Sequence, residues 1–276
     1  MKPLILSMVI TLLGSTWALQ AQNTDEQTAF DEILDLYENG QLTSAQVLSE
    51  HFLDIYPDSE LYPRVLFNLG VVYRDLDQQD HASAIFKSIL EASYHEKEPY
   101  GGIMEWYALY RHRSAKHLAE IYLQRGQFKE ASQYVYLFDK VYPYQHFCGN
   151  ELSADRIYTS RIYAMVYRGQ GYNLKAITQL LPHLFYNGLA SNEWLLEDLE
   201  WLLRETYTED ELSSMVDHAY ANLKIAKNGK SASFKILGQK VQMNQGYYFK
   251  PAQEDLNERQ MWEMLFKQNP LLKKYL

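Results

Sequence analysis

Apolar residues recur along the chain at helical spacing, in stretches separated by glycine and proline. The clearest stretch contains Leu66, Leu69 and Tyr73, which are spaced three and four residues apart and therefore lie on one side of a helix. Gly70 and Ala82 are small, so two antiparallel helices can approach each other closely at these positions. The pattern predicts a helical hairpin with an apolar face left over for a neighbour.

Four alanines share the same surroundings, which indicates an internal repeat. A tyrosine stands nine residues before three of them, and a glycine stands five residues before three of them. Such a glycine predicts the end of a first helix, because glycine readily adopts the left-handed conformation. Prolines twelve residues after two of the alanines predict the end of a second helix. The repeat positions are Ala45, Ala82, Ala131 and Ala176, with Tyr73, Tyr122, Tyr167, Gly40, Gly126, Gly171, Pro57 and Pro143.

This order of a large residue, Leu-Gly, Tyr, then Ala, an aromatic residue and Pro resembles the tetratricopeptide repeat. The most complete copy runs from Leu66 to Phe86. The resemblance implies an α-solenoid of about four helical hairpins in residues 22–190, with the first helix of each hairpin on the concave surface. Stacking is expected because each hairpin leaves an apolar face that the next one buries.

The intervals between the alanines exceed the usual repeat length of about 34 residues, which predicts longer helices or loops. Ile103, Trp106 and Tyr110 recur at helical spacing without a breaker, so we expect one long helix from Ile103 to Gln124. Residues 144–154, which contain Cys148, are expected to form a loop.

Residues 191–276 depart from the repeat and predict a C-terminal segment of capping helices, a β-hairpin and a terminal helix. Trp194 and the leucines that follow indicate an apolar-faced helix, and Thr208 with Glu211 predicts a capping box for the next one, ending at Asn228-Gly229. Alternation in residues 233–249 predicts a β-hairpin with a third short strand, and residues 256–268 return to helix. The expected fold class is mainly α, with a small C-terminal α+β segment.

The first 21 residues are typical of a secretory signal peptide. Lys2 precedes an apolar run, Leu4 to Leu13, and small residues lead to Ala21. An uncleaved anchor is the alternative, but the run is shorter than the roughly 20 residues that span a bilayer. The single cysteine, Cys148, is far from this segment and provides no acceptor for a lipid anchor. The sequence therefore predicts a periplasmic or secreted protein.

Composition and motifs argue against several function classes. With 26 basic and 35 acidic side chains the net charge is −9, which disfavours a nucleic-acid binder that neutralises phosphates. No phosphate-binding loop or hydrolase motif occurs, so we expect no enzyme, no cofactor and no metal site. Weaker alternatives are metal binding by His112 with His117 or by His146 with Cys148, and an acid pair among Glu197, Asp198 and Glu200.

The candidate site is the face formed by the first helices of the hairpins. It carries six of the basic side chains of an acidic protein, which favours a protein or peptide partner that is acidic or ends in a carboxylate. The alternative is that these arginines pair with acidic residues on adjacent helices. A glycan or peptidoglycan ligand is the alternative partner, because Tyr and Trp can stack on sugars. The candidate residues are Arg64, Asn68, Arg74, Arg113, Lys116, Tyr158, Arg161 and Arg168.

Overall fold

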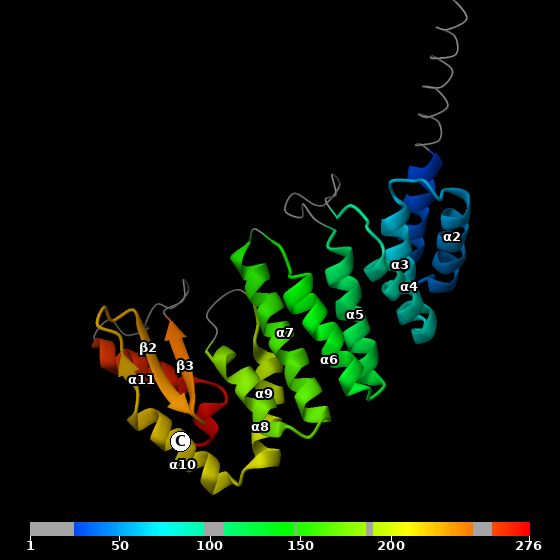
Figure 1. Ribbon diagram of the computed structural model, residues 1–276. Helices are drawn as coiled ribbons and strands as arrows, with labels where there is room; N and C mark the ends of the chain where they lie inside the picture. Colours follow the sequence, from blue (N-terminus) through cyan, green and yellow to red (C-terminus); the bar gives the residue numbers. More distant parts are fainter. Residues whose placement is uncertain (1–24, 97–107, 147, 186–189, 245–255) are drawn as a thin grey trace, which may run out of the picture. The chain divides into compact units, whose positions relative to one another are not determined.

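A computed structural model of the chain describes residues 25–96, 108–146, 148–185, 190–244 and 256–276. The described part is mostly helical, with one small antiparallel sheet (Figure 1). It divides into two compact units, one comprising residues 25–96 and 108–118 and the other the described residues from 119 onward. They are called unit 1 and unit 2. The predicted signal peptide lies outside the described residues.

Unit 1 consists of helices packed around apolar side chains. Residues 25–38 are helical, and α2 packs on α3, which packs on α4. Phe30, Ile33, Phe52 and Val65 form a buried cluster between the first of these helices. The bounds in this unit are α2 (Leu42–Ile55), α3 (Tyr62–Asp75), α4 (Gln79–Glu91) and the first part of α5 (Tyr110–Gln124).

Unit 2 continues with helices and ends in the sheet. In it α6 packs on α7, α7 on α8, and α9 on both α7 and α8. Its core is continuous from Ile157 to Tyr275 and crosses the predicted domain boundary at residue 190. The helices are α6 (Phe128–Tyr136), η1 (Leu137–Val141), α7 (Gly149–Gly169), α8 (Asn173–Leu180), η2 (Leu181–His183), α9 (Glu193–Thr206), α10 (Glu209–Ala221), α11 (Glu258–Gln268) and η3 (Leu272–Lys274).

The same turn joins the two helices of four hairpins. The residue five positions before each repeat alanine has a positive φ, and the next amide donates to the carbonyl five residues back over 2.8 Å. This is the Schellman arrangement, which satisfies carbonyls at a helix end. Each alanine is the fourth residue of the second helix and is fully buried. The φ values are 72° at Gly40, 59° at Asp77, 68° at Gly126 and 81° at Gly171.

Asp77 is the one residue at this turn position that is not glycine, which leads to a stability prediction. A side chain in the left-handed region costs up to about 1 kcal/mol relative to glycine. Asp77→Gly should therefore raise the free energy of unfolding by about 0.5–1 kcal/mol, and Gly126→Asp should lower it by a similar amount. Steric clashes do not affect the comparison, because a Cβ added at Gly126 would have no atom within 4 Å. Urea denaturation checks both, and changes of the same sign would contradict the prediction.

Three of the predicted boundaries are wrong. The helix expected from Ile103 begins at Tyr110, because Leu109 before it has a φ of 52°; residues 103–107 lie outside the described residues. The loop expected over 144–154 ends early, since α7 already begins at Gly149. The helix expected to reach Asn228-Gly229 ends at Ala221, because Lys224 and Ile225 pair with the next strand.

The C-terminal sheet confirms the predicted hairpin, but its third strand precedes the hairpin, in residues that were expected to be helical. It has the order β1 (Lys224–Ile225), β2 (Ser231–Ile236), β3 (Gln239–Asn244), and Leu237 and Gly238 form the β2–β3 turn with positive φ. The expected end of the hairpin, residues 245–249, lies outside the described residues. One face of the sheet, with Phe234, is buried in the core, where the Phe234 ring lies 4.9 Å from that of Phe266 on α11. The capping box of Thr208 and Glu211 at α10 is confirmed.

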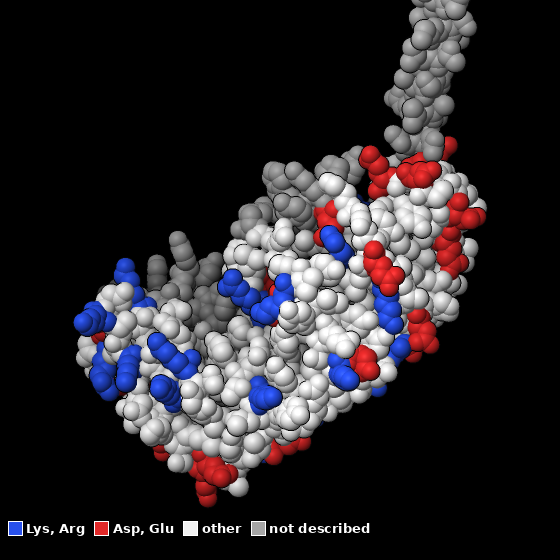
Figure 2. All heavy atoms as spheres, in the orientation of Figure 1, with Lys and Arg blue, Asp and Glu red and all other residues white. Residues whose placement is uncertain are grey.

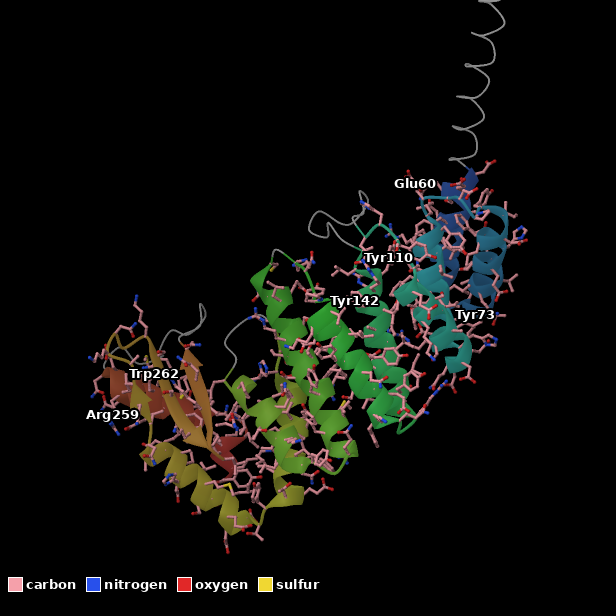
Figure 3. All side chains as sticks on the ribbon, in the orientation of Figure 1. Glu60, Tyr73, Tyr110, Tyr142, Arg259 and Trp262 are labelled. Atoms are coloured by element: carbon pink, nitrogen blue, oxygen red, sulfur yellow. The ribbon has the colours of Figure 1, made fainter. Side chains whose placement is uncertain are left out.

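Two side chains hold the end of the chain against other parts of unit 2. The indole Nε1 of Trp262, a fully buried residue of α11 (Figure 3), donates to the carbonyl of Gly229 over 3.1 Å. The side-chain amide of Asn269 donates to the carbonyl of Leu184 over 3.0 Å, and its oxygen accepts from two amides after Pro270. Leu271, Leu272 and Tyr275 are buried, whereas Leu276 is half exposed.

His183 makes the stability of unit 2 depend on pH. Burial, followed by the nearby charge of Arg156, lowers the pKa of His183 below 6.5, and its ring lies 2.8 Å from the Ser160 hydroxyl. The unfolded chain takes up a proton near pH 6.5 that the folded chain resists. The contribution of neutral His183 is therefore present above pH 6.5 and is lost as the pH falls below that value. Between pH values of about 7.5 and 5.5, the free energy of unfolding should fall more steeply in the wild type than in His183→Gln, and equal slopes would contradict this.

Candidate functional site

The three candidate residues of unit 2 lie on α7, and two of them contact α9. The Nε of Arg161 donates to the Asp198 carboxylate, and the Arg161 guanidinium carbon lies 5.6 Å from the centre of the Trp194 ring. The guanidinium carbon of Arg168 lies 3.4 Å from the centre of the Trp201 ring. Because residue numbers rise together on both helices, α7 and α9 run side by side in the same direction.

These contacts define what we call the α7–α9 face, formed by Arg161, Met165, Arg168, Trp194, Asp198 and Trp201. The spacing on each helix is four and three residues, which places each set of three on one side of its helix. Three large apolar side chains are exposed on this face, with relative exposures of 69% for Trp194, 41% for Trp201 and 40% for Met165.

The exposure of the tryptophans was not foreseen in the sequence. The pattern assigned Trp194 to the apolar side of its helix with Leu195 and Leu199, yet both leucines are buried and Trp194 is not. One signal in the sequence could have indicated this exposure. Trp194 and Trp201 are seven residues apart, and each stands one residue before a leucine of the apolar stripe, so both lie beside the stripe rather than within it. The same interval separates Arg161 from Arg168 on α7.

Tyr158 is a hydrogen-bond donor rather than a titrating group. Its hydroxyl donates to the Glu120 carboxylate of α5. Burial and the negative charge of Glu120 raise the pKa of Tyr158 well above its usual value, because both disfavour a phenolate. The phenol therefore stays protonated and links α7 to the part of α5 that belongs to unit 2.

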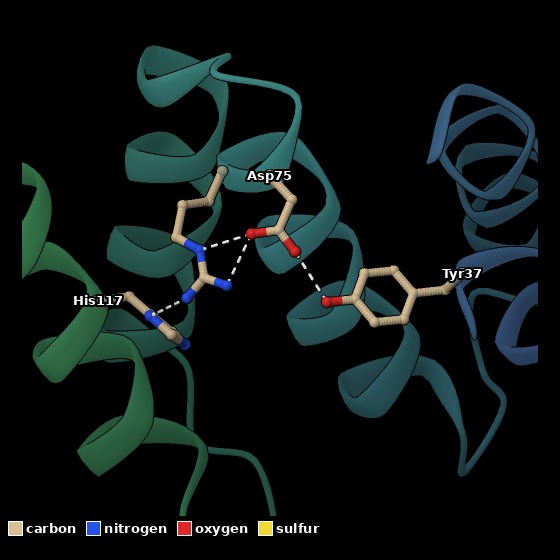
Figure 4. Close-up of polar contacts among 4 residues, drawn as sticks. Tyr37, Asp75 and His117 are labelled. Atoms are coloured by element: carbon tan, nitrogen blue, oxygen red, sulfur yellow. Dashed lines mark hydrogen bonds and ion pairs between the residues drawn. The ribbon is translucent and has the colours of Figure 1, made fainter. Parts of the chain in front are cut away.

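In unit 1, Arg74 belongs to a chain of polar contacts that links three helices (Figure 4). Its guanidinium contacts the Asp75 carboxylate at 2.9 and 2.7 Å and the ring of His117 at 2.9 Å. Asp75 also accepts from the hydroxyl of Tyr37 over 2.8 Å. His117 in turn stacks on Phe86, with ring centres 4.9 Å apart. Arg74 thus pairs with an acidic residue of its own helix, whereas the alternative expected acidic partners on adjacent helices, as Arg161 has in Asp198.

The other candidate residues of unit 1 are half-buried on α3 and α5. The guanidinium carbon of Arg64 lies 5.2 Å from the centre of the Phe30 ring. Asn68 lies on α3, and Arg113 and Lys116 lie on α5. Five of the eight candidates thus belong to unit 1 and three to unit 2, and the close contacts described above are made within each unit.

Several residues of the weaker chemical alternatives contact other groups of the chain. The His146 ring accepts from the backbone amide of Cys148 over 3.0 Å. Glu200 binds Lys274 at 2.5 Å, and Asp198 binds Arg161. Within the described ranges, no group of three His, Cys, Asp or Glu residues is placed to hold a metal ion.

Among the described residues, none of the helices combines the length and the apolar character that crossing a bilayer requires. Comparisons with protein-family models, with curated proteins and with solved structures find no match to this chain.

Proposed function

We propose that this protein is a non-catalytic interaction module of the tetratricopeptide type that is exported to the bacterial periplasm and holds a segment of a partner protein. The four hairpins would stack into a solenoid, with first helices such as α7 and α9 on its concave surface. The support for this architecture is the turn repeated at Gly40, Asp77, Gly126 and Gly171, together with the fully buried alanine that follows each one. The parallel course of α7 and α9 is what stacked first helices require.

The α7–α9 face is the observation that carries the proposal. Trp, Arg and Met are enriched in protein interfaces, and exposed Trp and Arg are the commonest energetic centres of such interfaces. Here Met165, Trp194 and Trp201 are exposed beside Arg161 and Arg168. Each arginine is stacked on an indole, which holds its guanidinium in place before a partner arrives. Less conformational entropy would then be lost on binding.

The chemistry of the face suggests the character of the partner segment. Exposed indole and thioether surfaces favour apolar side chains, while a guanidinium favours a carboxylate that it can bind with two hydrogen bonds. Arg161 is already paired with Asp198, so a partner carboxylate would exchange with Asp198 rather than meet an unpaired charge. We therefore propose an extended segment that combines apolar and acidic side chains.

The proposal is tested by affinity capture from the cell envelope with the mature chain as bait. A specific partner should be lost with Trp194→Ala, Trp201→Ala and Arg161→Glu. It should be retained by Tyr172→Ala, because Tyr172 is an exposed aromatic residue outside this face. Arg113→Glu reports separately on unit 1. A partner held unchanged by all the α7–α9 variants would contradict the proposal, and glycan-array binding that depends on Trp194 or Trp201 would favour the glycan alternative.

Export is tested independently of binding. If residues 1–21 are a signal peptide, the protein recovered from the periplasm should begin at Gln22. A cytoplasmic protein that retains Lys2 would contradict this part of the proposal.

A further inference from the structure

The outer face of the C-terminal sheet is polar and positively charged. In the β2–β3 pairing, Lys235 lies directly opposite Lys240, and Lys224 of β1 lies opposite Ser233. These three lysines are exposed, while Phe234, Ile236 and Val241 beside them on β2 and β3 are buried. The other side chains of β2 and β3 on this face are Ser231, Ser233, Gln242 and Asn244. The described part of the face therefore carries no carboxylate. We call it the lysine face.

This arrangement lowers the stability of the isolated chain. Two like charges directly opposite on neighbouring strands repel each other. The segment that contains the sheet is basic as a whole, since residues 222–276 contain ten Lys and Arg and only four Asp and Glu in a chain of net charge −9. Figure 2 shows basic side chains gathered over the part of unit 2 that contains β2, β3 and α11. A face of this kind fits an anionic partner.

The first hairpin of unit 1 has the opposite character. Residues 25–60 contain ten Asp and Glu and no Lys or Arg. Asp31, Asp35 and Glu38 are exposed on the helix of residues 25–38 and are spaced four and three residues apart. Carboxylates at this spacing on a helix repel one another. We call these three residues the acidic stripe.

We propose that the lysine face of one copy of the chain docks on the acidic stripe of a second copy. Within each cluster the like charges repel one another, which costs free energy in the isolated chain. In the contact, the carboxylates of one copy would lie against the lysines of the other. The two surfaces differ, so the contact is head-to-tail, and it extends into chains of copies unless the geometry closes a ring. The inference does not depend on the α7–α9 face or on its partner.

The first test is the mass of the mature chain in solution as a function of concentration and salt. At an ionic strength of about 0.01 M, where the Debye length is about 30 Å, the average mass should rise with concentration. At about 1 M, where that length is about 3 Å, the protein should be monomeric. Sedimentation velocity measures both. A wild-type monomer under both conditions, or association that persists at high salt, would overturn the proposal.

Charge exchange identifies the two surfaces. Lys235→Glu/Lys240→Glu and Asp31→Lys/Asp35→Lys should each weaken self-association by at least about tenfold, because like charges then meet at the contact. A mixture of the two variants should associate again, and so should a chain that carries all four substitutions. Failure of both rescues would overturn the proposal.

A matched control separates the lysine face from net charge. Lys129→Glu/Lys175→Glu changes the net charge by the same amount at exposed lysines of α6 and α8 and should leave self-association unchanged. Circular dichroism establishes that each variant is folded. Vesicles that contain an anionic phospholipid test the other anionic partner: a monomer that binds them through Lys235 and Lys240, without associating with itself, would refute docking on a second copy.

Discussion

Replacing Trp262 with alanine is expected to lower the free energy of unfolding by about 3–5 kcal/mol. Trp262 is fully buried and is the largest such side chain in the described part of the chain. The change removes its apolar contacts, leaves a cavity between α11 and the sheet, and deprives the Gly229 carbonyl of its indole donor. Urea denaturation followed by far-ultraviolet circular dichroism measures the loss.

Trp262→Phe is the matched variant for this prediction. It keeps a buried ring but loses the indole N–H, so its cost should be smaller, about 1–3 kcal/mol. Destabilisation of less than about 1 kcal/mol by Trp262→Ala would show that α11 does not hold the C-terminal sheet in place. Other residues of the same core would then have to hold the strands of the lysine face in place.

Replacing Ala82 with leucine is expected to lower the free energy of unfolding by about 1–3 kcal/mol through overpacking. Ala82 is fully buried in α4, which packs on α3. This pair of helices is already close, because a Cβ added at Gly70 of α3 would lie 2.8 Å from the Phe86 ring of α4. Additional methyl groups at Ala82 would force the helices apart. The change in the urea midpoint measures the effect.

Ala84→Leu is the control on the same helix. Ala84 is exposed two residues further along α4, so leucine there should change stability by no more than about 0.5 kcal/mol. Similar effects of the two substitutions would show that the small residue at the repeat position is not required for close packing.

The helical hairpins could be predicted from the sequence because their determinants are local. A glycine followed five residues later by alanine specifies a left-handed turn and a close helix contact within one short segment. The structure extends this rule to Asp77, which adopts the same conformation without being glycine. The capping box at Thr208 was predictable for the same reason, since its partners are three residues apart.

Errors occurred where distant residues decide the local structure. The helix α10 stops at Ala221 although no breaker precedes Asn228-Gly229, because Lys224 and Ile225 form hydrogen bonds with β2 instead. Helix α5 starts late because Leu109 has a left-handed conformation, which the apolar periodicity around it does not indicate.

The candidate site, too, was predictable from the sequence only in part. The spacing of Arg161 and Arg168 on one helix was visible in the sequence, whereas their contacts with Trp194 and Trp201 depend on how α9 packs against α7. The sequence places both tryptophans at the edge of the leucine stripe, but whether a neighbouring helix covers such an edge depends on tertiary packing.

The helical hairpins, their turns and the C-terminal β2–β3 hairpin are predictable from the sequence alone, since residues a few positions apart control each of them. The tertiary structure alone decided where α10 ends, which tryptophans are exposed and that Lys235 faces Lys240. These features depend on strand pairing and helix packing. Such contacts form between residues far apart in the chain and can override local preference.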